Sequence, residues 1–249
     1  TKFDTNKIHL RASLQSETNF SPKEYVTRLM LSEILSKGIK LNRQIYNETS
    51  VEQFYGKNGI QRNFSIGDYG LRIHMSLPKE SSVNTTIKLL KNEIKTPLMS
   101  VTDFNYLKSK LLAELRGSSN SVNTTAKVLL NQKLFKPGSV HYRHSFKDLV
   151  NSLQNVTYED VKNEHLKSLK AKSVVSILGN KNINFNDVGQ NGIIKLKPET
   201  LKTTNETIKH FIPGKTSCTV LMGSHVNPNL ATQIAVNCLG NGFSGKLMK

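Results

Sequence analysis

Hydrophobic residues recur along this chain first with the period of a β-strand and then with that of an α-helix, and this order limits the folds open to it. Apolar and polar residues alternate over residues 8–14, which predicts a half-buried strand. A helix should follow, because Ser21 and Glu24 form a capping box around Pro22 and apolar residues then recur at helical spacing as far as Gly38. The chain therefore opens with a strand-helix unit.

Further elements can be predicted from the same periodicities. A short helix at 51–55 should stop at Gly56, and two strands at 61–66 and 71–77 should pair as a hairpin. Helices are then expected over 83–94, 104–115 and 122–134, with breakers at Pro97, Gly117 and Pro137, followed by a helix capped by Thr157 and a strand at 173–178. This order indicates an α+β fold in which helices pack on one face of a mostly antiparallel sheet.

The end of the chain repeats the pattern of its beginning. Residues 186–204 are rich in Asn, Gly, Lys and Thr and show little periodicity, which is typical of a linker. Beyond them a strand at 218–222 and a helix at 230–239 return in the opening order. We therefore expect a complete domain over 1–185, a linker over 186–204 and the start of a second, homologous domain over 205–249.

The formal charge of +17 raises nucleic acid as a partner, since clustered Lys and Arg bind phosphates. The basic residues are spread along the whole chain, however, with no run of five or more. We therefore favour a residue bias of an AT-rich genome over a nucleic-acid footprint. No stretch approaches the roughly 18 apolar residues of a spanning helix, so a membrane is not expected as a partner.

Two patterns imitate ligand sites. Residues 240–246 nearly match a phosphate-binding loop, but they follow an expected helix, and Leu247 stands where such a loop needs Ser or Thr. His141 and His144 are three residues apart, as in some metal sites, but they follow the loop-forming Pro137 and Gly138, and no third ligand can be placed. We expect neither a nucleotide site nor a metal site here.

Four stretches carry a more specific signal: Ser32–Gly38, Ala126–Leu130 with Pro137–Tyr142, Leu153–Val161 and Ser176–Asn180. In this order they resemble the insulinase, pitrilysin and mitochondrial-processing-peptidase family of zinc peptidases. The resemblance covers nearly the whole chain. It implies repeated α+β domains of about this size, the second of which would open near residues 211–216.

The catalytic motif of that family is absent from the matching helix. Family members carry HxxEH there, in which two histidines hold zinc and the glutamate activates water. Aligning the helix on Gly38 places Leu29 and Glu33 at the histidine positions and Ser32 at the glutamate position. The resemblance therefore implies no catalytic or metal-binding residue and no cofactor in this chain, with zinc held by a catalytic half or partner subunit.

The resemblance further implies a non-catalytic part that closes over peptide substrates, with the peptide added as a strand to a sheet edge. Its partners would be the catalytic half or subunit and the peptide. Gly240, Gly242, Phe243 and Ser244 are expected to form a turn on the substrate side. Two alternatives stay open, a basic nucleic-acid-binding module and a purely structural family member. The compartment also stays open between periplasm, cytoplasm and organelle.

Overall fold

The computed structural model of this chain describes residues 6–15, 21–41, 44–67, 69–79, 81–139, 141–179, 183–185, 187–193, 207–216 and 219. The helix expected at 230–239 and the turn of Gly240, Gly242, Phe243 and Ser244 lie outside these residues, as does the strand expected at 218–222 apart from Thr219. The second expected domain thus stays a prediction.

A five-stranded sheet forms the centre of the molecule. Its strands are β4 (Gln61–Gly67), β5 (Gly70–Pro78), β1 (Lys7–Gln15), β6 (Lys172–Leu178) and β7 (Gln190–Asn191), in that spatial order. Every neighbouring pair is antiparallel except β6 with β7. The predicted α+β class is therefore confirmed.

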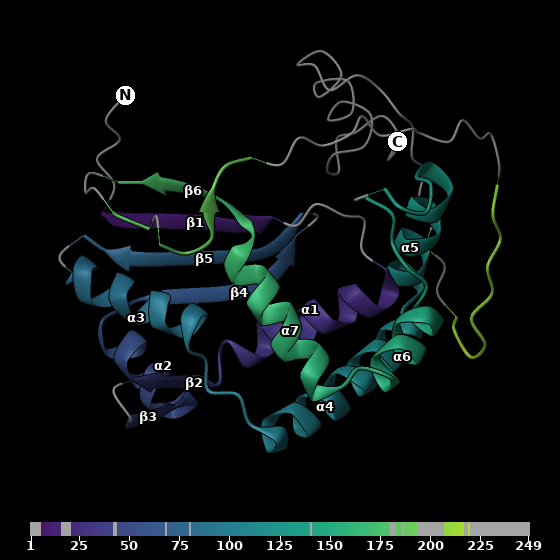
Figure 1. Ribbon diagram of the computed structural model, residues 1–249. Helices are drawn as coiled ribbons and strands as arrows, with labels where there is room; N and C mark the ends of the chain where they lie inside the picture. The colour runs from purple at the N-terminus through teal and green to yellow at the C-terminus, as the bar shows by residue number, and fades with distance from the viewer. Residues whose placement is uncertain are drawn as a thin grey trace, which may run out of the picture.

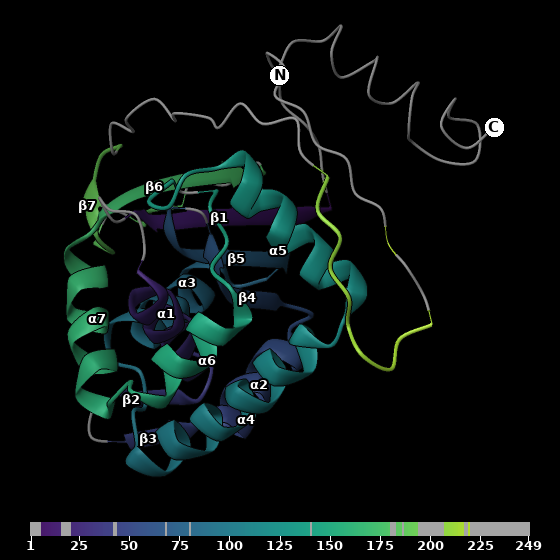
Figure 2. The same ribbon diagram turned by 90° about the vertical axis from the view of Figure 1, so that its right-hand side faces the viewer.

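Helices cover one face of this sheet, which is the lower side in Figure 1. They are α1 (Pro22–Ile34), α3 (Val83–Lys95), α4 (Val101–Ser119), α6 (Phe146–Gln154) and α7 (Tyr158–Lys170). Alternate residues of β1, from Ile8 to Leu14, are buried in the single core between the layers. Figure 2 shows α5 (Val122–Leu134) running beside this stack. None of the helices in the described ranges is long and apolar enough to cross a bilayer.

The capping residues predicted from the sequence determine where two of the helices begin. The Glu24 N–H donates to Ser21 Oγ at 3.2 Å, and the Ser21 N–H donates to Glu24 Oε2 at 2.9 Å, which completes the predicted capping box of α1. Thr157 and Asp160 form the same arrangement at the start of α7. These local bonds explain why both helices begin where the sequence predicted.

Gly38 has a different role from the one expected. The first helix ends at Ile34, and Gly38 instead opens a two-stranded sheet of β2 (Gly38–Leu41) and β3 (Gln44–Asn47) that the sequence analysis did not predict. Its φ is 120°, and a Cβ at this position would lie 2.2 Å from the Tyr46 carbonyl oxygen. The hairpin therefore needs glycine at this position.

Other expectations need correction. Neither Gly56 nor Gly117 ends a helix, because α2 (Glu48–Lys57) and α4 run through them. The helix α6 was missed, although the Ser145 hydroxyl caps it by accepting from the Asp148 N–H at 3.1 Å. Part of the expected linker carries β7 and the buried Val188. The packed unit thus continues at least to Asn191.

Candidate functional site

The three residues that the sequence alignment on Gly38 places at the zinc-motif positions lie on α1. Leu29 is half-buried against the core, and Ser32 is buried with its hydroxyl donating to the Leu29 carbonyl at 2.8 Å. Glu33 is partly exposed and accepts a hydrogen bond from Lys110 Nζ on α4 at 3.1 Å. This hydrogen bond raises the pKa of Lys110.

These side chains do not fit a zinc ion. Leu29 has no ligand atom, Ser32 is engaged with the helix backbone, and the carboxylate of Glu33 is already paired. Catalytic zinc sites instead use three ligands, usually including imidazoles. Across the described ranges, no three His, Cys, Asp or Glu side chains are grouped so that they could hold a metal.

The two histidines singled out in the sequence lie in the connection between α5 and α6. The ring of His141 is 5.2 Å from that of Phe135, and the ring of His144 is 5.5 Å from that of Tyr142. Both are partly buried among aromatic neighbours, in a segment without helical structure, as predicted.

Helix α1 is fixed to α7 by charged pairs. Arg28 Nε donates to Glu164 Oε1, and both side chains are almost fully buried. Nearer the solvent, Lys23 Nζ lies 3.0 Å from Asp160. His165, also on α7, has its Nε2 2.6 Å from the carbonyl oxygen of Ile94 at the end of α3. The two ion pairs therefore hold α1, which carries Leu29, Ser32 and Glu33, against α7.

Alongside α1, β4 forms one edge of the main sheet. Within the described residues β5 is its only strand neighbour, so the other edge of β4 has no strand beside it. Gln61 and Asn63 are exposed on this strand, whereas Phe64 is buried. Such an edge offers backbone N–H and C=O groups to an added strand.

A buried polar cluster anchors β4 to two helices. Arg62 Nε lies 2.8 Å from Glu93 Oε1 on α3, and Arg62 Nη2 lies 3.0 Å from Glu52 Oε1 on α2. The Tyr55 hydroxyl donates to Glu93 Oε2 at 2.6 Å. Burial raises the pKa of Glu93 to about 7, because it outweighs the opposing effects of Arg62 and Tyr55.

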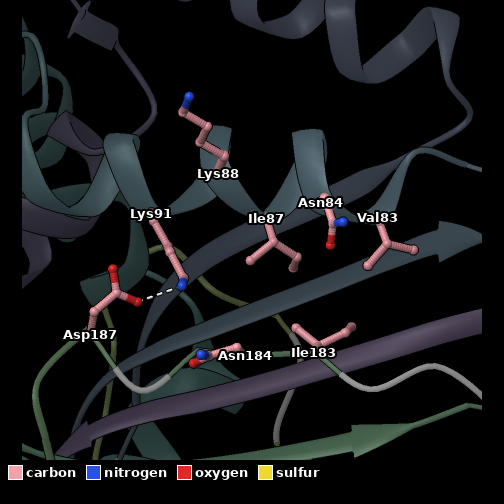
Figure 3. Close-up of a pocket in the computed structure, with 8 residues that line it drawn as sticks. All are labelled: Val83, Asn84, Ile87, Lys88, Lys91, Ile183, Asn184 and Asp187. Carbon is pink, nitrogen blue, oxygen red and sulfur yellow. Dashed lines mark ion pairs between the residues drawn. The ribbon is translucent and has the colours of Figure 1, made fainter.

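Two hollows open on the surface beside α3. The larger, of about 590 Å³, lies between α2, α3 and the β2–β3 hairpin. The smaller, of about 330 Å³, lies between α3 and Ile183, Asn184 and Asp187, and Figure 3 shows Ile87 and Ile183 facing each other across it.

An ion pair spans the smaller hollow. Lys91 pairs with Asp187, as the dashed line in Figure 3 marks, and Lys95 Nζ lies 2.6 Å from the same carboxylate. Burial tends to raise the pKa of Asp187, but hydrogen bonds from Lys91 and Lys95 outweigh it and lower the pKa to about 2. These two ion pairs fasten Asp187 to α3 along the hollow.

Solved structures share this fold, although no protein-family model and no curated protein matches the sequence. A structure described as peptidase M16 inactive domain from Pseudomonas fluorescens matches 100% of this chain and 62% of its own, with a TM-score of 0.70 and 14% identity. A protease from Helicobacter pylori matches 79% of this chain and 49% of its own, with a TM-score of 0.60 and 15% identity.

A third match is the ferredoxin protease FusC in complex with Arabidopsis ferredoxin. It covers 79% of this chain and 22% of its own, with a TM-score of 0.54 and 10% identity. The chain spans less than two thirds of each matched structure. At these identities the likeness shows a shared fold.

Proposed function

We propose that this chain is a non-catalytic part of a zinc-dependent metallopeptidase, and that it encloses and positions peptides for hydrolysis by a catalytic half or partner subunit. One observation carries the proposal. The side chains of Leu29, Ser32 and Glu33, the residues that we assign to the zinc-motif positions of α1, do not fit zinc, and the whole of this chain matches 62% of a structure described as an inactive peptidase domain.

The edge of β4 supports the peptide-handling part of the proposal. An extended peptide can add to a free sheet edge through main-chain hydrogen bonds. The strand is backed by Arg62 and Glu93, which hold it against α3, so its edge is presented without rearrangement. A matched fold solved as a protease in complex with another protein, ferredoxin, is consistent with a protein or peptide partner.

The first test is metal content and hydrolysis. We expect the purified chain to retain no stoichiometric zinc after dialysis and to cleave no quenched-fluorescent peptide alone, because α1 supplies no imidazole. The catalytic half or subunit, recovered by co-purification with the tagged chain from its own cells, should gain at least about tenfold in peptide hydrolysis when the chain is added.

The control is the same catalytic part supplied with heat-unfolded chain. One zinc per chain together with hydrolysis, both lost when His141 or His144 is replaced, would show that the chain is itself an enzyme. Complex formation without any gain in hydrolysis would instead indicate a purely structural family member.

A second candidate function, binding of nucleic acid, is favoured by one surface. No Asp or Glu occurs in β1, β4, β5 or β6. Exposed Arg11 on β1 lies opposite His74 on β5, and the rings of His9 and His74 stack with centroids 6.3 Å apart. Burial, Arg11 and His9 lower the pKa of His74, so His74 adds little positive charge at neutral pH.

This candidate predicts micromolar binding of a single-stranded oligonucleotide near physiological salt, measured by fluorescence anisotropy. Affinity should fall steeply as salt rises, because released counterions drive the binding. Arg11→Glu should weaken binding at least about tenfold, since it reverses a charge on this face, whereas Lys147→Glu on α6 should have little effect. Binding that is absent, or equally weakened by both variants, excludes the candidate.

A further inference from the structure

We propose that the larger hollow, here called the α2–α3 groove, binds an extended peptide segment that carries a large apolar residue next to a carboxylate, with its backbone paired along β3. The inference goes beyond the proposed function, because it requires neither zinc nor a catalytic partner.

The first support is the outer edge of β3. The strand β2 is flanked on its other side by residues 96–98, since the Lys40 N–H donates to Thr96 O at 3.1 Å and the Leu98 N–H donates to Gly38 O at 2.8 Å. The strand β3 has β2 as its only strand neighbour in the described residues. Its outer backbone groups are therefore available to an added strand.

The side chains of β3 do not protect that edge. Exposed edge strands are commonly protected by Lys, Pro or a bulge. Residues 44–47 contain neither Lys nor Pro, and all four are exposed, with Ile45 at 63% and Tyr46 at 38%. The edge of β3 is therefore open to pairing with another extended segment.

The second support is the apolar groove that begins at this strand. Its apolar lining consists of Leu41, Tyr46, Val51, Phe54 and Leu89. A volume of about 590 Å³ is large enough for an aromatic or leucine side chain with its neighbours. Because Tyr46 belongs both to β3 and to the groove wall, a peptide strand paired along β3 would place alternate side chains toward the groove.

The third support is the charge at the groove. Lys57 of α2 and Lys88 of α3 both line it, are exposed, and have no ion pair in the described part of the chain. The two acidic residues of α2 are already paired, because Glu48 binds Lys37 at 2.7 Å and Glu52 binds Arg62 at 3.0 Å. The groove therefore favours a carboxylate beside the apolar side chain.

These features together select a peptide over other ligands. A fatty acid would satisfy the apolar wall and the lysines but would leave the backbone groups of β3 unused. A nucleic acid would use the lysines and the aromatic rings of Tyr46 and Phe54 but would leave the backbone groups of β3 unused. An acidic, apolar peptide strand uses all three features.

The test uses the full chain without added zinc or partner, so a negative result leaves the peptidase proposal standing. The probe is a fluorescein-labelled peptide, Gly-Ser-Thr-Val-Phe-Asp-Thr-Ser, followed by fluorescence anisotropy. We expect saturable binding with a Kd of about 10–100 µM, typical of short peptides on a sheet edge. Replacing Phe by Ser, replacing Asp by Asn, or N-methylating alternate amides should each weaken binding, by about tenfold for Phe and for methylation.

Protein variants then locate the site. The double variant Lys57→Glu and Lys88→Glu should weaken binding at least about tenfold, because it reverses the only unpaired charges of the groove. The matched control, Lys147→Glu with Lys167→Glu, makes the same charge change on the exposed surfaces of α6 and α7 and should change Kd less than about twofold.

Four results would overturn the proposal. The first three are the absence of saturable binding up to about 1 mM peptide, equal weakening by both double variants, and full binding of the peptide methylated on alternate amides. Concentration-dependent dimerisation in sedimentation that excess peptide does not reduce would also overturn it, in favour of a second copy of this chain on β3.

Discussion

Replacing Glu93 with alanine is expected to lower the free energy of unfolding by about 3 kcal/mol, one of the two largest effects that we predict for a single substitution. Glu93 is fully buried and accepts the hydrogen bond of the Tyr55 hydroxyl while pairing with Arg62. Alanine would leave a buried hydroxyl without its acceptor and a buried guanidinium with one carboxylate fewer. Urea unfolding followed by circular dichroism measures the change.

Glu52→Ala is the matched control, because it removes the other carboxylate on Arg62. The Glu52 side chain is 55% exposed, so its loss should cost less than about 1 kcal/mol. Equal costs for the two alanine variants would contradict the prediction, since burial would then not decide the strength of the interaction.

The same cluster sets a pH dependence. Burial raises the pKa of Glu93 from 4.5 to about 7, so the folded state holds this proton more tightly than the unfolded state. The stabilisation that comes from the protonated Glu93 is therefore complete below about pH 4.5 and is lost as the pH rises to about 7. By linkage this stabilisation amounts to about 3 kcal/mol. Glu93→Gln should remove the corresponding change of the unfolding free energy with pH.

The second large effect concerns the junction of α1 and α7. Glu164→Ala should lower the free energy of unfolding by about 3–5 kcal/mol, because it leaves the buried charge of Arg28 without this carboxylate. Replacing both residues with apolar side chains, Arg28→Met with Glu164→Leu, should restore most of the loss. Chemical denaturation of the three proteins tests both expectations.

A control for this pair lies between the same two helices. Lys23 is 51% exposed and pairs with Asp160, so Lys23→Ala should cost less than about 1 kcal/mol. If Glu164→Ala were no more costly than Lys23→Ala, the buried pair would contribute little to fixing α1 in place.

Local sequence signals predicted much of this fold. The alternation over β1 and the capping boxes of α1 and α7 depend on neighbours within a few residues, and each element formed as expected. The signal for α6 was also present, as Ser145 with Asp148 and the spacing of Leu149 and Leu153, but it was overlooked. These elements need no knowledge of the tertiary structure.

The glycine positions were harder to predict. Gly56 and Gly117 lie within helices, where glycine costs about 1 kcal/mol relative to alanine. Packing of their neighbours Tyr55 and Leu115 in or against the core offsets this cost. The hairpin of β2 and β3 depends on bonds to residues 96–98, distant in sequence, so no local pattern could have placed it.

Only part of the candidate site could be read from the sequence. Leu29, Ser32 and Glu33 were placed on one helix, but their engagement by the helix backbone and by Lys110 depends on α4. Charged residues of a helix are normally expected on its exposed face, so the burial of Glu93 and Glu164 was missed. Glu93 does lie three residues after Leu90 on the apolar stripe of α3, which was the available signal.

The position of β1 within the sheet has a consequence for synthesis on the ribosome. Leu14 pairs with Leu71 on one side and with Ser173 on the other, so the first strand to emerge gains its second partner only near the end of the described sheet. Until then one edge of β1 is open to wrong pairing with other nascent chains. The strand order thus leaves this edge of β1 unpaired until β6 has been synthesised, and during that interval chaperones or the chain's own helices can cover it.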